Sequence, residues 1–203
     1  MSGLPIGSSA VPTKVLLDAS KSTTSSKQAS RERALEIKRL QEEALRGLPV
    51  DSLYVVLYLR SDPPAPNDFH WGYYFHTHPD GGIKYHLKSL GSGWITEHGP
   101  TGGVFKSNFL CVLVHIATVP QEKHLQVDQI MKSLDGRCNS IPGITCRVWI
   151  MNILQKLIEN GIVQCPSIAE FQQECFTIGN QNSKNASANN QPRPVIISRV
   201  CII

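Results

Sequence analysis

Two histidines and one cysteine are the residues whose types and spacing suggest chemistry. His70 lies in an aromatic, strand-like run at 69–75, and His86 lies in a second such run. Cys146 opens the most apolar helical segment of the chain. Acyl transfer through a cysteine requires a thiol at a helix N-terminus and imidazoles on neighbouring strands. We therefore take Cys146, His70 and His86 as candidate catalytic residues.

The position of Cys146 favours an activated thiol. Thr145 is a natural N-cap for the helix that follows, so the sulfur is expected near unpaired backbone N–H groups and the positive end of the helix dipole. Such an environment stabilises the thiolate. The alternative is a small buried side chain at the start of a core helix, since free cysteine is often buried. Helix position alone leaves both interpretations open.

The two histidines are predicted to lie on adjacent strands. Asp80-Gly81 between the strand-like runs 69–77 and 82–90 is a hairpin signal, because glycine tolerates the positive φ of the turn. This pairing puts His70 and His86 at similar heights, where His86 can orient His70 by a hydrogen bond. The alternative for His70 is a strand-end histidine bonded to backbone.

The rest of the chain predicts an α+β fold, an antiparallel sheet packed against helices. Strands are expected at 50–60, 69–77, 82–90, 93–98, 109–119 and 195–203, and helices at 126–134, 146–160 and 167–177. The domain organisation has four parts: a flexible tail at 1–28, a charged helix at 29–47, a single domain at 48–203, and a flexible loop within it near 179–191.

Composition places the chain among ordinary soluble proteins, with 41% hydrophobic and 18% charged residues and a net charge of +4. No basic stripe interleaved with aromatics occurs, so nucleic acid is not an expected partner. No window reaches roughly 18 consecutive apolar residues, and no signal sequence is evident, so we expect no stable membrane anchor and a cytoplasmic protein. The charged helix is expected to dock on the domain or on a second copy, giving a homodimer.

Metal and nucleotide sites are the chemical rivals. The imidazoles of His76, His78, His86 and His98, with Glu97, are available to a metal, but no recognised ligand spacing occurs. The glycine-rich run at 99–103 lacks the Gly-Lys-Ser/Thr of a phosphate loop. We expect no metal and no cofactor. A histidine-rich metal enzyme is the least favoured alternative. A non-catalytic small-molecule-binding or interaction protein is favoured over it, and an enzyme that uses Cys146 is favoured over both.

These motifs together resemble those of a known superfamily. They are His70-Trp71 opening an aromatic strand, the Asp80-Gly81 turn, Tyr85-His86-Leu87, and a cysteine opening a downstream helix. They are similar to the circularly permuted NlpC-type papain-like superfamily, particularly its lecithin–retinol acyltransferase branch, over about residues 52–160 of this chain. The whole pattern is also similar to uncharacterised fungal proteins.

The resemblance implies a permuted papain-like fold and a cysteine-dependent hydrolase or acyltransferase acting on an amide, ester or thioester of a small molecule. In that reading Cys146 is the nucleophile, His70 the base and His86 the residue that orients it. Trp71, Tyr74 and Trp94 are the predicted substrate-binding walls. The branch has Asn-Cys-Glu-His-Phe at the nucleophile, where this chain has Thr-Cys-Arg-Val-Trp at 145–149. A lipid substrate is therefore not expected.

Overall fold

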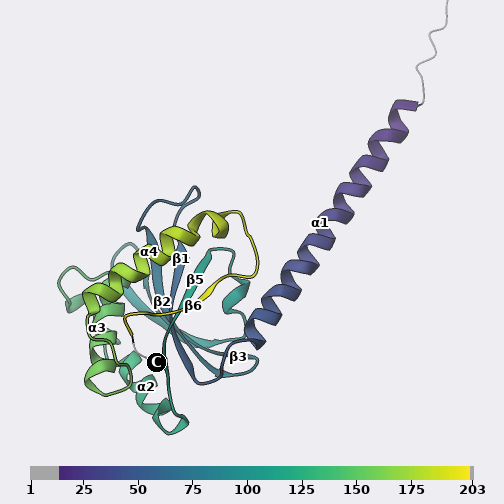
Figure 1. The fold of residues 1–203 in the computed structure, drawn as a ribbon. Coiled ribbons are helices and arrows are strands. Elements are labelled where there is room, and N and C mark those ends of the chain that lie inside the picture. The colour runs from purple at the N-terminus through teal and green to yellow at the C-terminus, as the bar shows by residue number, and fades with distance from the viewer. Residues whose placement is uncertain (1–13, 202–203) are drawn as a thin grey trace, which may run out of the picture. The chain divides into compact units, whose positions relative to one another are not determined.

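The computed structural model describes the backbone of residues 14–201 and the side chains of residues 26–201, as an α+β protein built on one sheet (Figure 1). The chain divides into two compact units after Lys38, within helix α1 (Lys14–Arg46). The second unit holds the sheet and every other helix that the structure describes. None of the helices described is both long and apolar enough to cross a bilayer.

The six strands form one mostly antiparallel sheet in the order β4-β3-β2-β1-β5-β6, in which only the β5–β6 pair is parallel. They are β1 (Ser52–Leu59), β2 (Phe69–His78), β3 (Gly81–Ser89), β4 (Trp94–Thr101), β5 (Leu110–Thr118) and β6 (Val195–Ile197). The predicted α+β class is confirmed. The predicted strands are present because their β-branched and aromatic residues suit a pleated, half-buried surface. The last is shorter than predicted, because β6 ends at Ile197 and residues 198–201 of the predicted strand at 195–203 are not in a strand.

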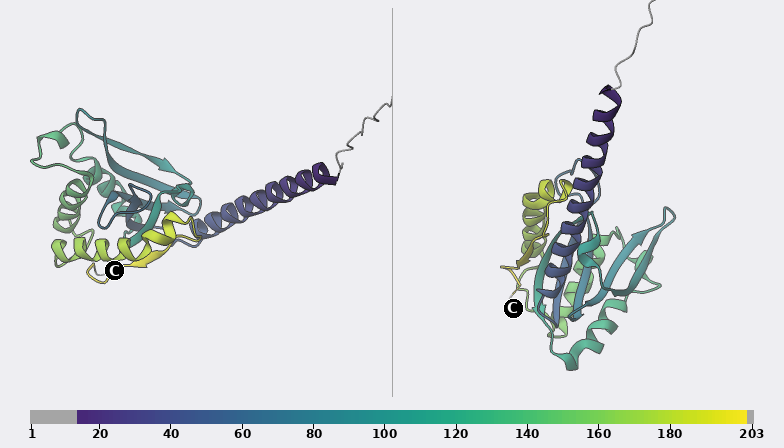
Figure 2. Two further views of the ribbon diagram at one scale, coloured as in Figure 1. Left: turned by 90° about the horizontal axis from the view of Figure 1, so that it is seen from above. Right: turned by 90° about the vertical axis from the view of Figure 1, so that its right-hand side faces the viewer.

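Three helices follow β5: α2 (His124–Lys132), α3 (Cys146–Glu159) and α4 (Ile168–Ser187). Residues of all three enter one apolar core on the same face of the sheet (Figures 1 and 2). Helix α3 begins as predicted, since the Thr145 hydroxyl accepts the Val148 N–H at 3.1 Å. The Tyr73 hydroxyl of β2 donates to the Ile150 carbonyl at 2.8 Å, which fixes α3 against the sheet.

Both faces of the sheet are covered, and alternation along each strand decides which face a residue meets. On β2, Trp71 and Tyr73 point into the core beneath the helices. Tyr74 points to the opposite face, into a smaller cluster with Leu45 and Phe105. That second cluster lies under the end of α1 and the short 3-10 turn Val104–Lys106. Neighbouring residues of β2 therefore enter two separate cores.

The helix predicted to begin at residue 29 begins earlier in the structure, within the tail predicted at 1–28. Helix α1 begins at Lys14, so residues 14–28 are helical, and residues 1–13 lie outside the described part. The charged helix predicted at 29–47 is the C-terminal half of this longer helix. Once a helix has nucleated, each added residue gains a hydrogen bond without a new nucleation cost, so a Ser- and Thr-rich segment can extend it.

The prediction of a flexible loop near 179–191 is wrong over most of that range, because α4 continues to Ser187. Gly179 sits in this helix against the sheet, where a Cβ would lie 2.7 Å from the Phe69 ring. The buried Arg193 guanidinium donates to the carbonyls of Asn185 and Asn190, and so binds the end of α4. A polar composition suggested a loop, whereas close packing and this cap hold a helix.

Candidate functional site

The two predicted histidines meet on the face of the sheet opposite α3. His70 Nε2 lies 3.1 Å from His86 Nδ1 in a hydrogen bond, so their predicted proximity is confirmed. His86 pairs in register with Gly72 of β2, two residues along from His70. A Cβ at Gly72 would lie 3.4 Å from the His86 Cβ, so the absence of a side chain leaves the two rings room to meet.

A carboxylate extends this pair on the next strand. His86 and Glu97 are register partners on β3 and β4, and His86 Nε2 lies 2.8 Å from Glu97 Oε2. The carboxylate favours a proton on His86 Nε2, which leaves His86 Nδ1 as an acceptor. His70 then donates from Nε2, and its Nδ1 carries the free lone pair. Assigned in this way from the charge of Glu97, the tautomers make His70 the basic end of a three-residue chain.

The electrostatics of the site keep both imidazoles neutral at neutral pH. Burial lowers the pKa of His70 to about 4, and the electrostatic influence of the His86 imidazole and the positive charges of Arg60 and Lys84 add to that effect. Burial also lowers the pKa of His86, Lys84 adds to the effect, and Glu97 opposes it. A neutral imidazole is the form that accepts a proton or binds a ligand's hydrogen-bond donor.

His70 and His86 line a pocket of about 330 Å³. Its remaining walls combine hydroxyls, apolar side chains, one glycine and one amine: Tyr58, Thr101, Ser107, Leu59, Val104, Phe109, Gly103 and Lys84. No carboxylate is among these lining residues. A pocket of this size in which polar groups converge beside apolar residues can hold a small molecule, so this is the candidate functional site.

Cys146 does not belong to this site. The cysteine is 3% exposed and lies in the apolar core under the helices. His70 alternates with Trp71, which points into that core, so His70 points to the other face. The sheet therefore separates Cys146 from His70 and His86, and the predicted Cys146–His70–His86 triad is corrected to a histidine pair without the thiol.

The predicted substrate-binding aromatics do not form a common wall either. Trp71 is buried edge-on against Phe176, with ring centroids 5.5 Å apart. Tyr74 is buried on the opposite face, where its hydroxyl lies 2.8 Å from His76 Nδ1. Trp94 starts the edge strand β4. None of the three predicted aromatics lines the histidine pocket.

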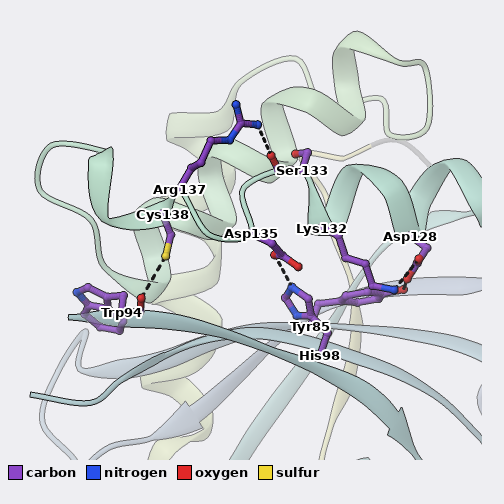
Figure 3. Close-up of polar contacts among 9 residues, drawn as sticks. All are labelled: Tyr85, Trp94, His98, Asp128, Lys132, Ser133, Asp135, Arg137 and Cys138. Carbon is purple, nitrogen blue, oxygen red and sulfur yellow. Dashed lines mark hydrogen bonds and ion pairs between the residues drawn. The ribbon is translucent and has the colours of Figure 1, made fainter. Parts of the chain in front are cut away.

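Figure 3 shows where the helix-side polar groups of β3 and β4 lie. His98 Nε2 lies 3.1 Å from Asp135 Oδ1, and the Tyr85 hydroxyl donates to Asp128 of α2 at 2.8 Å. The Trp94 carbonyl accepts from the Cys138 thiol at 3.2 Å. These contacts join the edge of the sheet to α2 and the segment that follows it.

The histidines considered as metal ligands are thus spread over both faces of the sheet. His98 lies on the helix side and His86 on the other. His76 is fully buried, while His78 is exposed. Across the part of the chain that the structure describes, no group of three or more His, Cys, Asp or Glu side chains is placed to hold a metal ion.

Sequence reasoning treated Glu97 only as a metal ligand and missed its contact with His86. The turn Gly91-Ser92-Gly93 held a usable signal, because a hairpin there pairs Ser89 with Trp94 and so His86 with Glu97. Ser107 and Phe109 were also missed. They reach the pocket from the connection between β4 and β5, which carries no local signal for that position.

The fold and the site define an α+β protein with a paired-histidine pocket on one face of an antiparallel sheet. The chain belongs to a family of unknown function, DUF6540, which matches residues 53–164, more than half of its length. The match spans His70, His86 and Glu97. No curated protein and no solved structure matches the chain. The papain-like resemblance therefore stays a hypothesis.

Proposed function

We propose that this protein is a hydrolase of small esters or amides, with His70 as general base and water as the nucleophile. The observation that supports this is the chain of contacts from Glu97 through His86 to His70, which ends at the wall of a ligand-sized pocket. The proposal keeps the reaction class predicted from the sequence and replaces the thiol by water.

The proposed reaction is a proton relay at one imidazole. His70 Nδ1 takes a proton from water as the water oxygen attacks the substrate carbonyl carbon. The resulting imidazolium is stabilised through its Nε2–H by His86, and through His86 by the negative charge of Glu97. His70 then returns the proton to the leaving group as the tetrahedral intermediate breaks down. General-base catalysis of this kind contributes roughly 10²–10⁴-fold in rate.

The cysteine mechanism is not proposed, because Cys146 would have to cross the sheet to reach either histidine. The non-catalytic alternative shares the same pocket, and turnover decides between them. The small-molecule substrate, the cytoplasmic location and the homodimer through the N-terminal helix stay predictions. So does the permuted papain-like architecture.

Hydrolysis of p-nitrophenyl acetate tests the proposal. An imidazole can act on this activated ester, as a nucleophile or by deprotonating water, without a special binding site. We expect His70→Gln to lower the rate by about 100-fold. The matched control is His78→Gln, whose side chain is 69% exposed and is not among the residues that line the pocket. Cys146→Ala should retain the rate, and thermal unfolding should show that all three variants fold.

Two outcomes would overturn the proposal. If Cys146→Ala abolishes hydrolysis while His70→Gln retains it, the thiol is the catalyst after all. If His70→Gln and His78→Gln hydrolyse the ester equally well, the pocket imidazole performs no proton transfer. In that second case the site is a binding site, as in the non-catalytic alternative.

A further inference from the structure

We infer that the histidine pocket takes a small carboxylate with an apolar, preferably aromatic, body. In this arrangement Lys84 binds the carboxylate and Phe109 contacts the body. The inference rests on the proposed function, because it names the substrate class of the same pocket: an ester or amide that also carries a carboxylate.

The charge of the pocket is the first argument for a carboxylate ligand. Lys84 precedes His86 by two residues on β3, so the two side chains share a face, and both line the pocket. Within the described residues no carboxylate lies within ion-pair distance of Lys84, whereas Lys88 on the same strand is paired with Glu97 at 3.7 Å. Glu97 interacts with the charge of Lys84 only at longer range. An amine with no carboxylate in contact, beside two neutral imidazoles, is a site for an anion.

The apolar side of the pocket is the argument for an apolar ligand body. Phe109 is 61% exposed, although it is a large aromatic residue. Its carbonyl accepts the Leu59 N–H at 2.8 Å, which anchors its backbone to the end of β1. With Val104 it forms the apolar part of the lining, whereas the side chain of Leu59, another lining residue, packs into the core under the helices. An anchored, exposed aromatic beside a pocket offers its face to a ligand, and burying it would add apolar contact.

The size of the pocket carries the third step. A volume of about 330 Å³ lies near the lower end of the roughly 300–1,000 Å³ found for small-molecule sites. It suits one ring with a short substituent. A long acyl chain or a folded peptide would need a longer groove. The carboxylate therefore belongs to a small molecule.

Calorimetric titration with three probes tests this inference on the full chain. Phenylacetate carries both features, phenylacetamide lacks the charge, and inorganic phosphate lacks the apolar body. We expect phenylacetate to bind at least about tenfold more tightly than either, since one charge-assisted hydrogen bond is lost with the amide. Lys84→Met should remove the preference for the acid over the amide. Lys156→Met, on α3 behind the sheet, should keep it.

Phe109→Ala tests the proposed contact with the apolar body of the ligand. It should weaken phenylacetate binding while leaving the ratio between acid and amide unchanged. A second measurement is the pKa of His70, followed by NMR as a function of pH. A bound anion should raise this pKa from the low value that burial imposes.

The inference falls if phenylacetamide binds as tightly as phenylacetate, if phosphate binds as tightly as phenylacetate, or if Lys84→Met changes nothing. Its failure is distinguishable from failure of the proposed hydrolase. Loss of ester hydrolysis in His70→Gln would still support the catalyst, even when phenylacetate does not bind. Conversely, phenylacetate binding with undiminished hydrolysis in His70→Gln would sustain the ligand class and refute the base.

Discussion

Acid should destabilise this fold through its buried, neutral histidines, and His70 is the position at which this can be measured. Burial lowers the pKa of His70 to about 4 in the folded protein, whereas an unfolded chain has a histidine pKa near 6.5. Between these values the unfolded state binds the proton that the folded state excludes. The stability is therefore complete above about pH 6.5 and is lost progressively as the pH falls towards 4.

The size of the effect follows from the separation of the two pKa values. A difference of about 2.5 units, at about 1.36 kcal/mol per unit, gives roughly 3 kcal/mol. This is an upper value, because the His70 ring is only partly buried and solvent screens its charge. Burial also lowers the pKa of His76 and His115, so the whole protein should lose more stability in acid than His70 accounts for.

Urea unfolding near pH 7 and near pH 4.5 measures the difference directly. His70→Gln removes the titrating group, so the variant should lose up to about 2 kcal/mol less than the parent protein between the two conditions, because pH 4.5 lies only about two units below the unfolded pKa. His78→Gln is the control, because it makes the same substitution at an exposed histidine that does not line the pocket. Equal losses of stability in the parent protein and in His70→Gln would refute the reasoning, since His70 would then titrate alike in both states.

Three further predictions follow from single contacts. Glu97→Gln removes the charge beside His86 and should slow p-nitrophenyl acetate hydrolysis by about tenfold, the value of one charge-assisted contact; an unchanged rate would exclude Glu97 from the relay. Gly179→Ala forces a methyl group towards the Phe69 ring and should cost about 1–3 kcal/mol in thermal unfolding, whereas an unchanged melting temperature would show that the helix can shift. Cys146 should react with iodoacetamide only as the protein unfolds, because it is 3% exposed; rapid labelling of the native protein, located by mass spectrometry, would contradict its burial.

The strands and the histidine contact could be predicted because their signals are local. Asp80-Gly81 fixes a tight turn between two aromatic runs, and a short turn fixes the register of the strands beside it. Register in turn placed His70 and His86 side by side, within the two-residue offset that the structure has. Thr145 similarly marked the first turn of α3.

The length of α4 could not be predicted because its support comes from far along the chain. The polar composition of residues 179–187 is typical of a loop. The helix persists there because Gly179 packs against Phe69, over a hundred residues earlier, and because Arg193 binds the final carbonyls. Long-range contacts of this kind override local propensity.

The misplacement of Cys146 is different, since the sequence held the argument against it. In a strand at 69–77, alternation puts Trp71, Tyr73 and Phe75 on one face and His70 on the other. An apolar helix packs against the more apolar face of a strand, so the helix that Cys146 opens had to lie with the three aromatics. His70 therefore had to point away from it. The motif resemblance placed Cys146 and His70 in one site, although the alternation puts them on opposite faces of the sheet. Alternation is the stronger constraint, because reversing it would expose the whole aromatic face.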